Sequence, residues 1–162
     1  MTAERAAYHR LMLLAGLREE YERELDQVLE TEAALSDLYL ELAMCMSDLD
    51  RTVSVLYNYT LEYEVDEQQV FDMVMLTLHR LYAHGQLNAT EICESLSKIQ
   101  QSCSFGEPWI DLYKYLYAYE LMTEGILSQK VFEKSFQAVF LRGERIDPWK
   151  LQESHNQKGE EL

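Results

Sequence analysis

Histidine, cysteine and carboxylate side chains are the residues of this 162-residue chain whose types could carry catalysis or hold a metal ion. A di-iron or di-manganese helical bundle requires Glu-x-x-His on two of its helices, and a zinc protease helix requires HExxH. None of the four histidines follows a carboxylate at the first spacing, and the second motif does not occur. We therefore expect no metal site.

The three cysteines, Cys45, Cys93 and Cys103, form no CxxC motif and are odd in number. This usage is typical of reduced thiols in the cytoplasm rather than of a disulfide framework or a zinc site. Cys45 lies in an apolar run, which favours an inert buried thiol, and the six glycines are too scattered to form a phosphate-binding loop. These observations favour a cytoplasmic protein that is not an enzyme and needs no cofactor.

Acidic residues are concentrated in residues 31–69, called here the acidic segment. The whole chain has 29 acidic and 14 basic residues, a net charge of −15, and this segment carries nine acids against Arg51 alone. Direct binding to nucleic acid or to an anionic membrane surface depends on clustered Lys and Arg, so this charge argues against both. No stretch is long and apolar enough to span a bilayer. The nine acids are Glu32, Asp37, Glu41, Asp48, Asp50, Glu62, Glu64, Asp66 and Glu67.

Tyrosines are interleaved with these acids, and tyrosine is enriched at protein interfaces. We expect the acidic segment to bind and neutralise a basic protein, as small acidic immunity proteins, antitoxins and phage-encoded inhibitors do. The competing interpretation is an acidic face that only keeps the protein soluble. The predicted partner-binding residues are Glu41, Asp48, Asp50, Tyr57, Tyr59, Glu62, Tyr63, Glu64, Asp66 and Glu67.

A second function is open, in which the protein is a helical-repeat adaptor or a secretion-type chaperone. Its groove would hold a peptide or a helix against four tyrosines, Tyr113, Tyr115, Tyr117 and Tyr119. Salt separates the two functions, because electrostatic association slows at high ionic strength and binding in an apolar groove hardly changes.

The elements that must position these residues are helices. Apolar residues recur at spacings of three and four along most of the chain, and glycine and proline are few, which predicts an all-α single domain. We expect about seven helices stacked as antiparallel hairpins in residues 1–152, and a polar, disordered tail in residues 153–162. One long helix is predicted over residues 7–28, with a bend at Gly16.

An internal similarity with a period of 40 residues links two segments of the C-terminal half. Residues 81–88 align with residues 121–128 without a gap, and each copy reads as helix, Gly-x-Leu turn, polar cap and helix. This period matches the unit of HEAT-like solenoids, so the half is predicted to hold a HEAT-like repeat pair. Two ordinary hairpins with similar turns would give the same pattern. In either case Tyr113–Tyr119 falls in a helix despite the alternation of its tyrosines.

Overall fold

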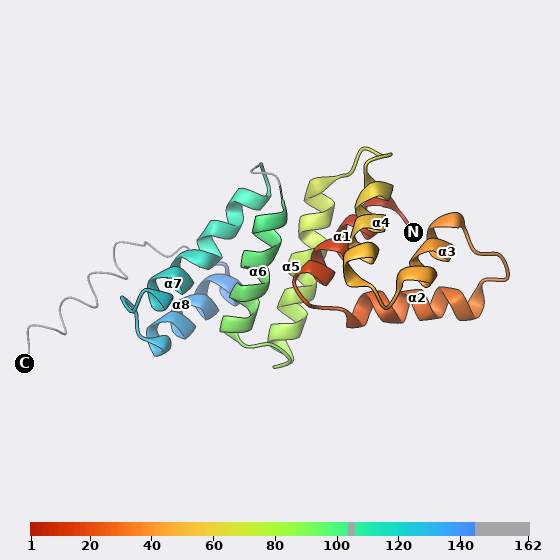
Figure 1. Cartoon of the computed structure of the whole chain (residues 1–162). Coiled ribbons are helices and arrows are strands. Elements are labelled where there is room, and N and C mark those ends of the chain that lie inside the picture. Colours follow the sequence, from red (N-terminus) through yellow and green to blue (C-terminus); the bar gives the residue numbers. More distant parts are fainter. Residues whose placement is uncertain (104–105, 145–162) are drawn as a thin grey trace, which may run out of the picture.

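Eight α-helices and one 3-10 helix follow one another in this computed structural model, which describes residues 1–103 and 106–144 (Figure 1). No strand occurs in those residues, and the predicted all-α single domain is confirmed. The predicted tail at 153–162 lies outside the described residues. The elements are α1 (Ala3–Leu14), α2 (Glu19–Thr31), α3 (Asp37–Cys45), α4 (Leu49–Thr60), α5 (Glu67–Ala83), α6 (Ala89–Ser102), η1 (Trp109–Leu112), α7 (Tyr113–Thr123) and α8 (Gln129–Arg142).

Five of the eight α-helices in the described residues begin where a short polar side chain accepts a hydrogen bond from the first helical turn. Asp66 and Ser128 cap α5 and α8, each from a position just before an apolar periodic run. Asn88 forms a full capping box with Glu91 at the start of α6. Thr2 and Asp48 cap α1 and α4, and each side chain accepts one backbone N–H of the first turn.

The prediction of one long helix over residues 7–28 is wrong. Helix α1 ends at Leu14, and Gly16 adopts a φ of 86°, in the left-handed region that favours glycine. The amide of Leu17 then donates to the carbonyl of Met12 over 2.8 Å, which closes the end of α1 before α2 begins at Glu19. This break is one reason why residues 1–103 and 106–144 hold eight α-helices rather than about seven.

The two Gly-x-Leu turns have the same hydrogen bonds. The amide of Gln86 donates to the carbonyl of Leu81 over 2.9 Å, and the amide of Ile126 donates to that of Leu121 over the same distance. Each turn joins an antiparallel pair, α5 with α6 and α7 with α8 (Figure 1). The local geometry therefore repeats after 40 residues, while the HEAT-like repeat itself stays a prediction.

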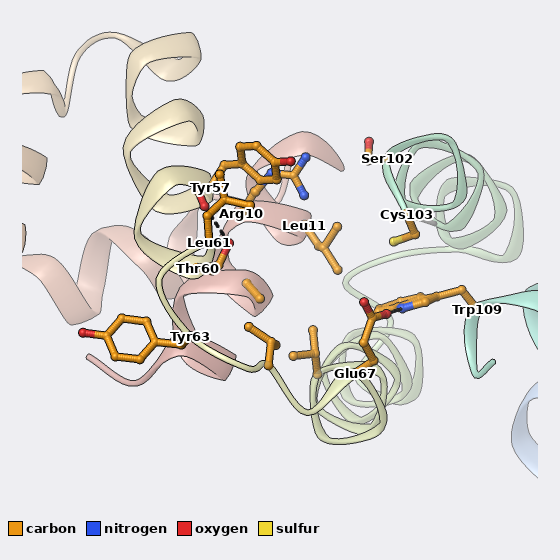
Figure 2. Close-up of a pocket in the computed structure, with 13 residues that line it drawn as sticks. Arg10, Leu11, Tyr57, Thr60, Leu61, Tyr63, Glu67, Ser102, Cys103 and Trp109 are labelled. Atoms are coloured by element: carbon orange, nitrogen blue, oxygen red, sulfur yellow. Dashed lines mark hydrogen bonds between the residues drawn. The ribbon is translucent and has the colours of Figure 1, made fainter. Parts of the chain in front are cut away.

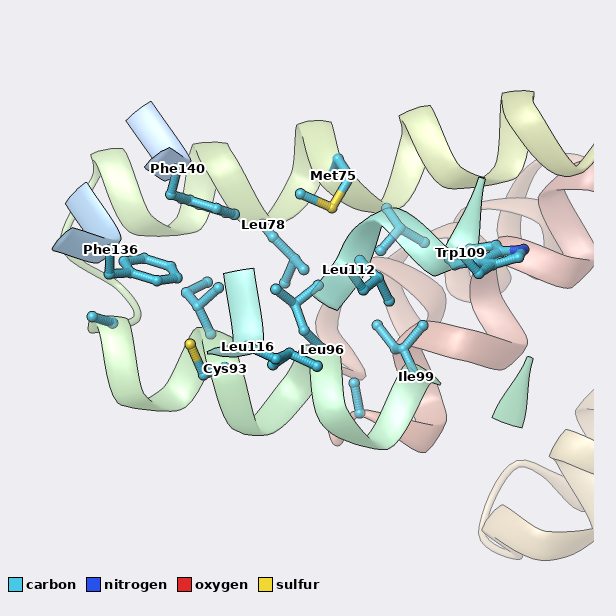
Figure 3. Packing of buried hydrophobic residues seen from close by; sticks show 14 of the residues in the cluster. Met75, Leu78, Cys93, Leu96, Ile99, Trp109, Leu112, Leu116, Phe136 and Phe140 are labelled. Carbon is cyan, nitrogen blue, oxygen red and sulfur yellow. The ribbon is translucent and has the colours of Figure 1, made fainter. Parts of the chain in front are cut away.

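Two hydrophobic clusters hold the helices together, and α1 contributes to both. The larger cluster joins α1 to α5, α6, η1, α7 and α8, with Leu78, Leu96 and Phe136 among its buried members (Figure 3). The smaller cluster joins α1 to α2, α3 and α4 around Leu42 and Leu56. None of the helices in the described part of the chain has the length and apolar character needed to cross a membrane.

Candidate functional site

All nine carboxylates of the acidic segment lie at the surface. None of them forms an ion pair with a basic side chain of residues 1–103 or 106–144. Two of them, Asp48 and Asp66, accept the capping hydrogen bonds of α4 and α5. The others leave a surface whose negative charge is not neutralised within the described structure, and such a surface attracts cationic partners.

Large apolar side chains are exposed in the same segment. Of the ten large hydrophobic residues that are exposed in the described chain, six lie between residues 40 and 63. On α3 the exposed residues Asp37, Leu40, Glu41 and Met44 follow the spacing of one helical face, and Met44 is 77% exposed. This face, called here the α3 face, therefore alternates carboxylates with apolar side chains. The six residues are Leu40, Met44, Met46, Tyr57, Leu61 and Tyr63.

The structure divides the predicted partner-binding residues between the two ends of α4. Asp48 and Asp50 lie at its start, beside the end of α3, whereas residues 62–67 follow its end. A helix of 12 residues is about 18 Å long, so one small partner group cannot touch both ends. Glu41 belongs to the α3 face. The sequence placed these residues in one segment but did not reveal this separation.

The three predicted tyrosine anchors differ in their accessibility. Tyr57 and Tyr63 are 45% and 51% exposed and can meet a partner. Tyr59 is only half-buried, but its hydroxyl donates to the carbonyl of Met1 over 3.0 Å, and its ring centroid lies 5.0 Å from that of Tyr63. Tyr59 therefore links Met1 to α4 through a hydrogen bond and packs against the ring of Tyr63.

A pocket of about 430 Å³ lies beside the end of α4, and three of the predicted residues line it: Tyr57, Tyr63 and Glu67 (Figure 2). Its other side chains come from α1, the end of α4, the α4–α5 connection, α5, the end of α6 and η1. We call it the Trp109 pocket. Its full lining is Ala7, Arg10, Leu11, Tyr57, Thr60, Leu61, Tyr63, Val65, Glu67, Val70, Ser102, Cys103 and Trp109.

Two residues of the Trp109 pocket were missed by sequence reasoning. The indole N–H of Trp109 donates to the carboxylate of Glu67, 42 residues earlier in the chain. The guanidinium of Arg10 lies 4.8 Å from the ring centroid of Tyr57, and its Nε is buried without a hydrogen-bond partner among the described residues. Neither long-range contact leaves a local signal in the sequence.

The four tyrosines of the alternative groove do not all face the same environment. The ring centroid of Tyr115 lies 5.6 Å from that of Phe140, and the centroid of Tyr119 lies 5.9 Å from that of Phe132. Both thus pack on the larger cluster, as Tyr117 also does. Tyr113 is 53% exposed. None of the four lines the Trp109 pocket, and the groove stays a prediction.

A second pocket, of about 650 Å³, lies between the α1–α2 turn and the end of α5. Its lining carries charges of both signs, and one pair of them, Arg80 and Glu20, is joined over 3.1 Å. The charged and ionisable side chains of this lining are Arg18, Glu19, Glu20, Arg23, Arg80 and His84.

An ionic network next to that pocket connects α1 with α2. The carboxylate of Glu24 lies 2.7 Å from Arg5 and 2.8 Å from Nε2 of the fully buried His9, and Arg5 also reaches Glu20 over 3.0 Å. Burial by itself would raise the pKa of Glu24, but the hydrogen bonds from His9 and Arg5 outweigh it and lower that pKa to about 2. Glu24 is therefore a fixed anion that holds two helices together.

The thiols are poorly suited to nucleophilic chemistry. Cys45 and Cys93 are buried, and Cys103 is half-buried at the Trp109 pocket. Burial raises the pKa of the Cys103 thiol to about 12, so little of the reactive thiolate forms at neutral pH. Within the described residues, no three His, Cys, Asp or Glu side chains gather as metal ligands would.

Known proteins supply no further guide to this surface. Comparison of the chain with protein-family models, with curated proteins and with solved structures found no match. Its function must therefore be inferred from the residues and the geometry above.

Proposed function

We propose that this protein is a non-catalytic binding protein that neutralises a basic protein partner through the acidic segment. The observation that carries the proposal is that exposed carboxylates and exposed apolar side chains occur together in this one segment. Nine exposed carboxylates without a described ion-pair partner share residues 31–69 with six of the ten exposed large apolar side chains. A face that served solubility alone would have no use for the apolar side chains, which cost free energy in water.

The two kinds of side chain have separate roles in the proposed complex. The carboxylates attract a cationic surface over a distance of about one Debye length and speed the encounter. The apolar side chains of the α3 face then lose contact with water. Met44 suits this role because its flexible, polarisable side chain adapts to an irregular partner surface.

The partner class follows from this chemistry. A protein with a positively charged groove for phosphate groups, such as a nuclease, would find its groove occupied by carboxylates. Small acidic immunity proteins, antitoxins and phage-encoded inhibitors act in this manner, and we place this chain in that functional class.

The test uses a synthetic amphipathic helix of lysine and leucine as the probe, with a glutamate–leucine peptide of equal length as its counterpart. An acidic-segment variant, Glu41→Lys/Glu62→Lys/Glu64→Lys, is compared with a control variant, Glu94→Lys/Glu120→Lys/Glu124→Lys. All six glutamates are exposed, and both variants change the net charge equally. Fluorescence anisotropy of the labelled peptides gives the Kd at low and at high salt.

We expect the lysine–leucine peptide to bind and the glutamate–leucine peptide not to bind. Three lost charge pairs at an exposed face should weaken binding about tenfold to a hundredfold, while the control variant should change the Kd only about twofold. Equal weakening by both variants would show that the net charge and not the acidic segment binds the peptide, and would refute the proposal. Binding that high salt leaves unchanged would favour the adaptor with an apolar groove.

A further inference from the structure

The carboxylate of Glu67 is oriented but not neutralised. It accepts the indole N–H of Trp109 at the wall of the Trp109 pocket, and no described basic side chain forms an ion pair with it. A carboxylate has two oxygens and can accept further hydrogen bonds after the first. Glu67 therefore retains both its charge and hydrogen-bonding capacity for a ligand.

The surroundings of the pocket are negative. Glu62, Glu64 and Asp66 lie in the connection between α4 and α5 that forms one side of the opening. Glu4 of α1 is near enough to Asp66 for the two carboxylates to repel each other. Arg10, the one base that the described residues contribute to the lining, lies over the ring of Tyr57. The local field thus favours a cation at the opening.

The pocket also has an apolar wall between its two charged groups. Figure 2 shows Arg10 and Glu67 on different sides of the pocket, with Leu11 between them. Val65 and Val70 extend the apolar lining. A lysine or arginine side chain matches this arrangement, because its apolar stem can lie on the apolar wall and its terminal cation can reach the carboxylate of Glu67. Its backbone carbonyl can accept a hydrogen bond from the guanidinium of Arg10, which lines the pocket.

We infer that the Trp109 pocket is a socket for one lysine or arginine side chain of the basic partner, with the cation on Glu67, the stem on Leu11 and Val70, and the flanking carbonyl on Arg10. This inference rests on the proposed function, because it names the partner group that the acidic segment would capture. A volume of about 430 Å³ falls in the range of small-ligand pockets and holds such a side chain with its flanking peptide groups.

The experiment observes the Trp109 indole N–H directly by ¹H–¹⁵N correlation NMR of the full chain. The chain has two tryptophans, and a Trp109→Phe variant assigns the signal. Two probes are titrated, Nα-acetyl-arginine amide and the matching citrulline derivative, which keeps the shape of arginine but lacks its charge. Glu67→Gln removes the charge and keeps an acceptor for the indole, while Glu64→Gln makes the same change outside the lining.

We expect blocked arginine to shift the Trp109 signal to saturation and blocked citrulline to leave it in place. Glu67→Gln should weaken arginine binding about tenfold, the effect of losing a hydrogen bond to a charged group, and Glu64→Gln should change it less than about twofold. Equal shifts with both probes, or equal effects of both variants, would overturn the inference.

The lysine–leucine peptide separates this inference from the proposed function. If the peptide binds in a salt-dependent manner while blocked arginine leaves the Trp109 signal unmoved, the socket is wrong and the proposed function stands. If the peptide does not bind but blocked arginine shifts the signal, the pocket accepts the cation and the proposed function fails.

Discussion

Replacement of Glu24 by glutamine should destabilise the protein strongly at neutral pH and much less in acid. The substitution keeps the shape of the side chain and an acceptor for His9, but it removes the charge between His9 and Arg5. The pKa of Glu24 falls from an ordinary value of 4.5 to about 2 in the folded protein. The Glu24 side chain is 23% exposed, so water screens this interaction only in part.

The size and the sign of the effect follow from proton linkage. One pKa unit corresponds to about 1.4 kcal/mol, so the ionised Glu24 stabilises the fold by about 3 kcal/mol. Because the folded pKa is the lower one, this stabilisation is fully present above pH 4.5. It is lost as the pH falls through the folded value near 2, and about 1.4 kcal/mol remains at pH 3.

Urea unfolding at pH 7 and at pH 3 measures the effect for the wild type, Glu24→Gln and Glu22→Gln. Glu22 is an exposed neighbour on the same helix, and its substitution should cost less than about 0.5 kcal/mol at either pH. Glu24→Gln should cost about 3 kcal/mol at pH 7 and less than half of that at pH 3. A cost for Glu24→Gln that is the same at both pH values would refute the assignment of the stabilisation to this charge.

Three further changes have outcomes that the structure sets. Gly16→Ala should cost about 1–2 kcal/mol in urea unfolding because alanine is strained at a φ of 86°, whereas Gly106→Ala, at a position without a positive φ, should cost far less. Asn88→Ala removes the hydrogen bond of the capping box that the Asn88 side chain accepts from the amide of Glu91. It should lower the melting temperature, with a free-energy cost of about 1 kcal/mol; an unchanged melting temperature would contradict this. Because burial raises the pKa of Cys103 to about 12, its alkylation at pH 8, followed by peptide mass mapping, should be about a thousandfold slower than that of a thiol with a pKa of 9, and each unit of pH should speed it about tenfold.

Local chemistry explains which features could be predicted from the sequence. The polar caps Asn88 and Ser128 and the Gly-x-Leu turns that end α5 and α7 depend on side chains within a few residues of each helix end, and the structure has them where the sequence predicts them. The break after α1 was underestimated, because Gly16 can either be tolerated in a helix at a modest cost or end it, and the sequence does not choose between the two.

Long-range contacts explain what could not be predicted. His9 and Glu24 lie on a stretch that reads as one amphipathic helix, and they meet only because the chain turns at Gly16. The pairing of Trp109 with Glu67 likewise requires η1 to return to the start of α5. The clustering of acids in residues 31–69 could be read from the sequence. That α4 separates these acids into two groups about 18 Å apart could not, because it depends on where the helix begins and ends.

The shared helix α1 makes the two hydrophobic clusters a single cooperative unit. Ala6 and Leu13 belong to the smaller cluster, while Tyr8 and Leu11 belong to the larger one, so α1 cannot leave either cluster without opening the other. Regions with separate cores can unfold separately and exchange their amide hydrogens at different rates. We therefore expect a partner that stabilises the acidic segment against unfolding to slow hydrogen exchange in α7 and α8 as well, at the far end of the molecule (Figure 1).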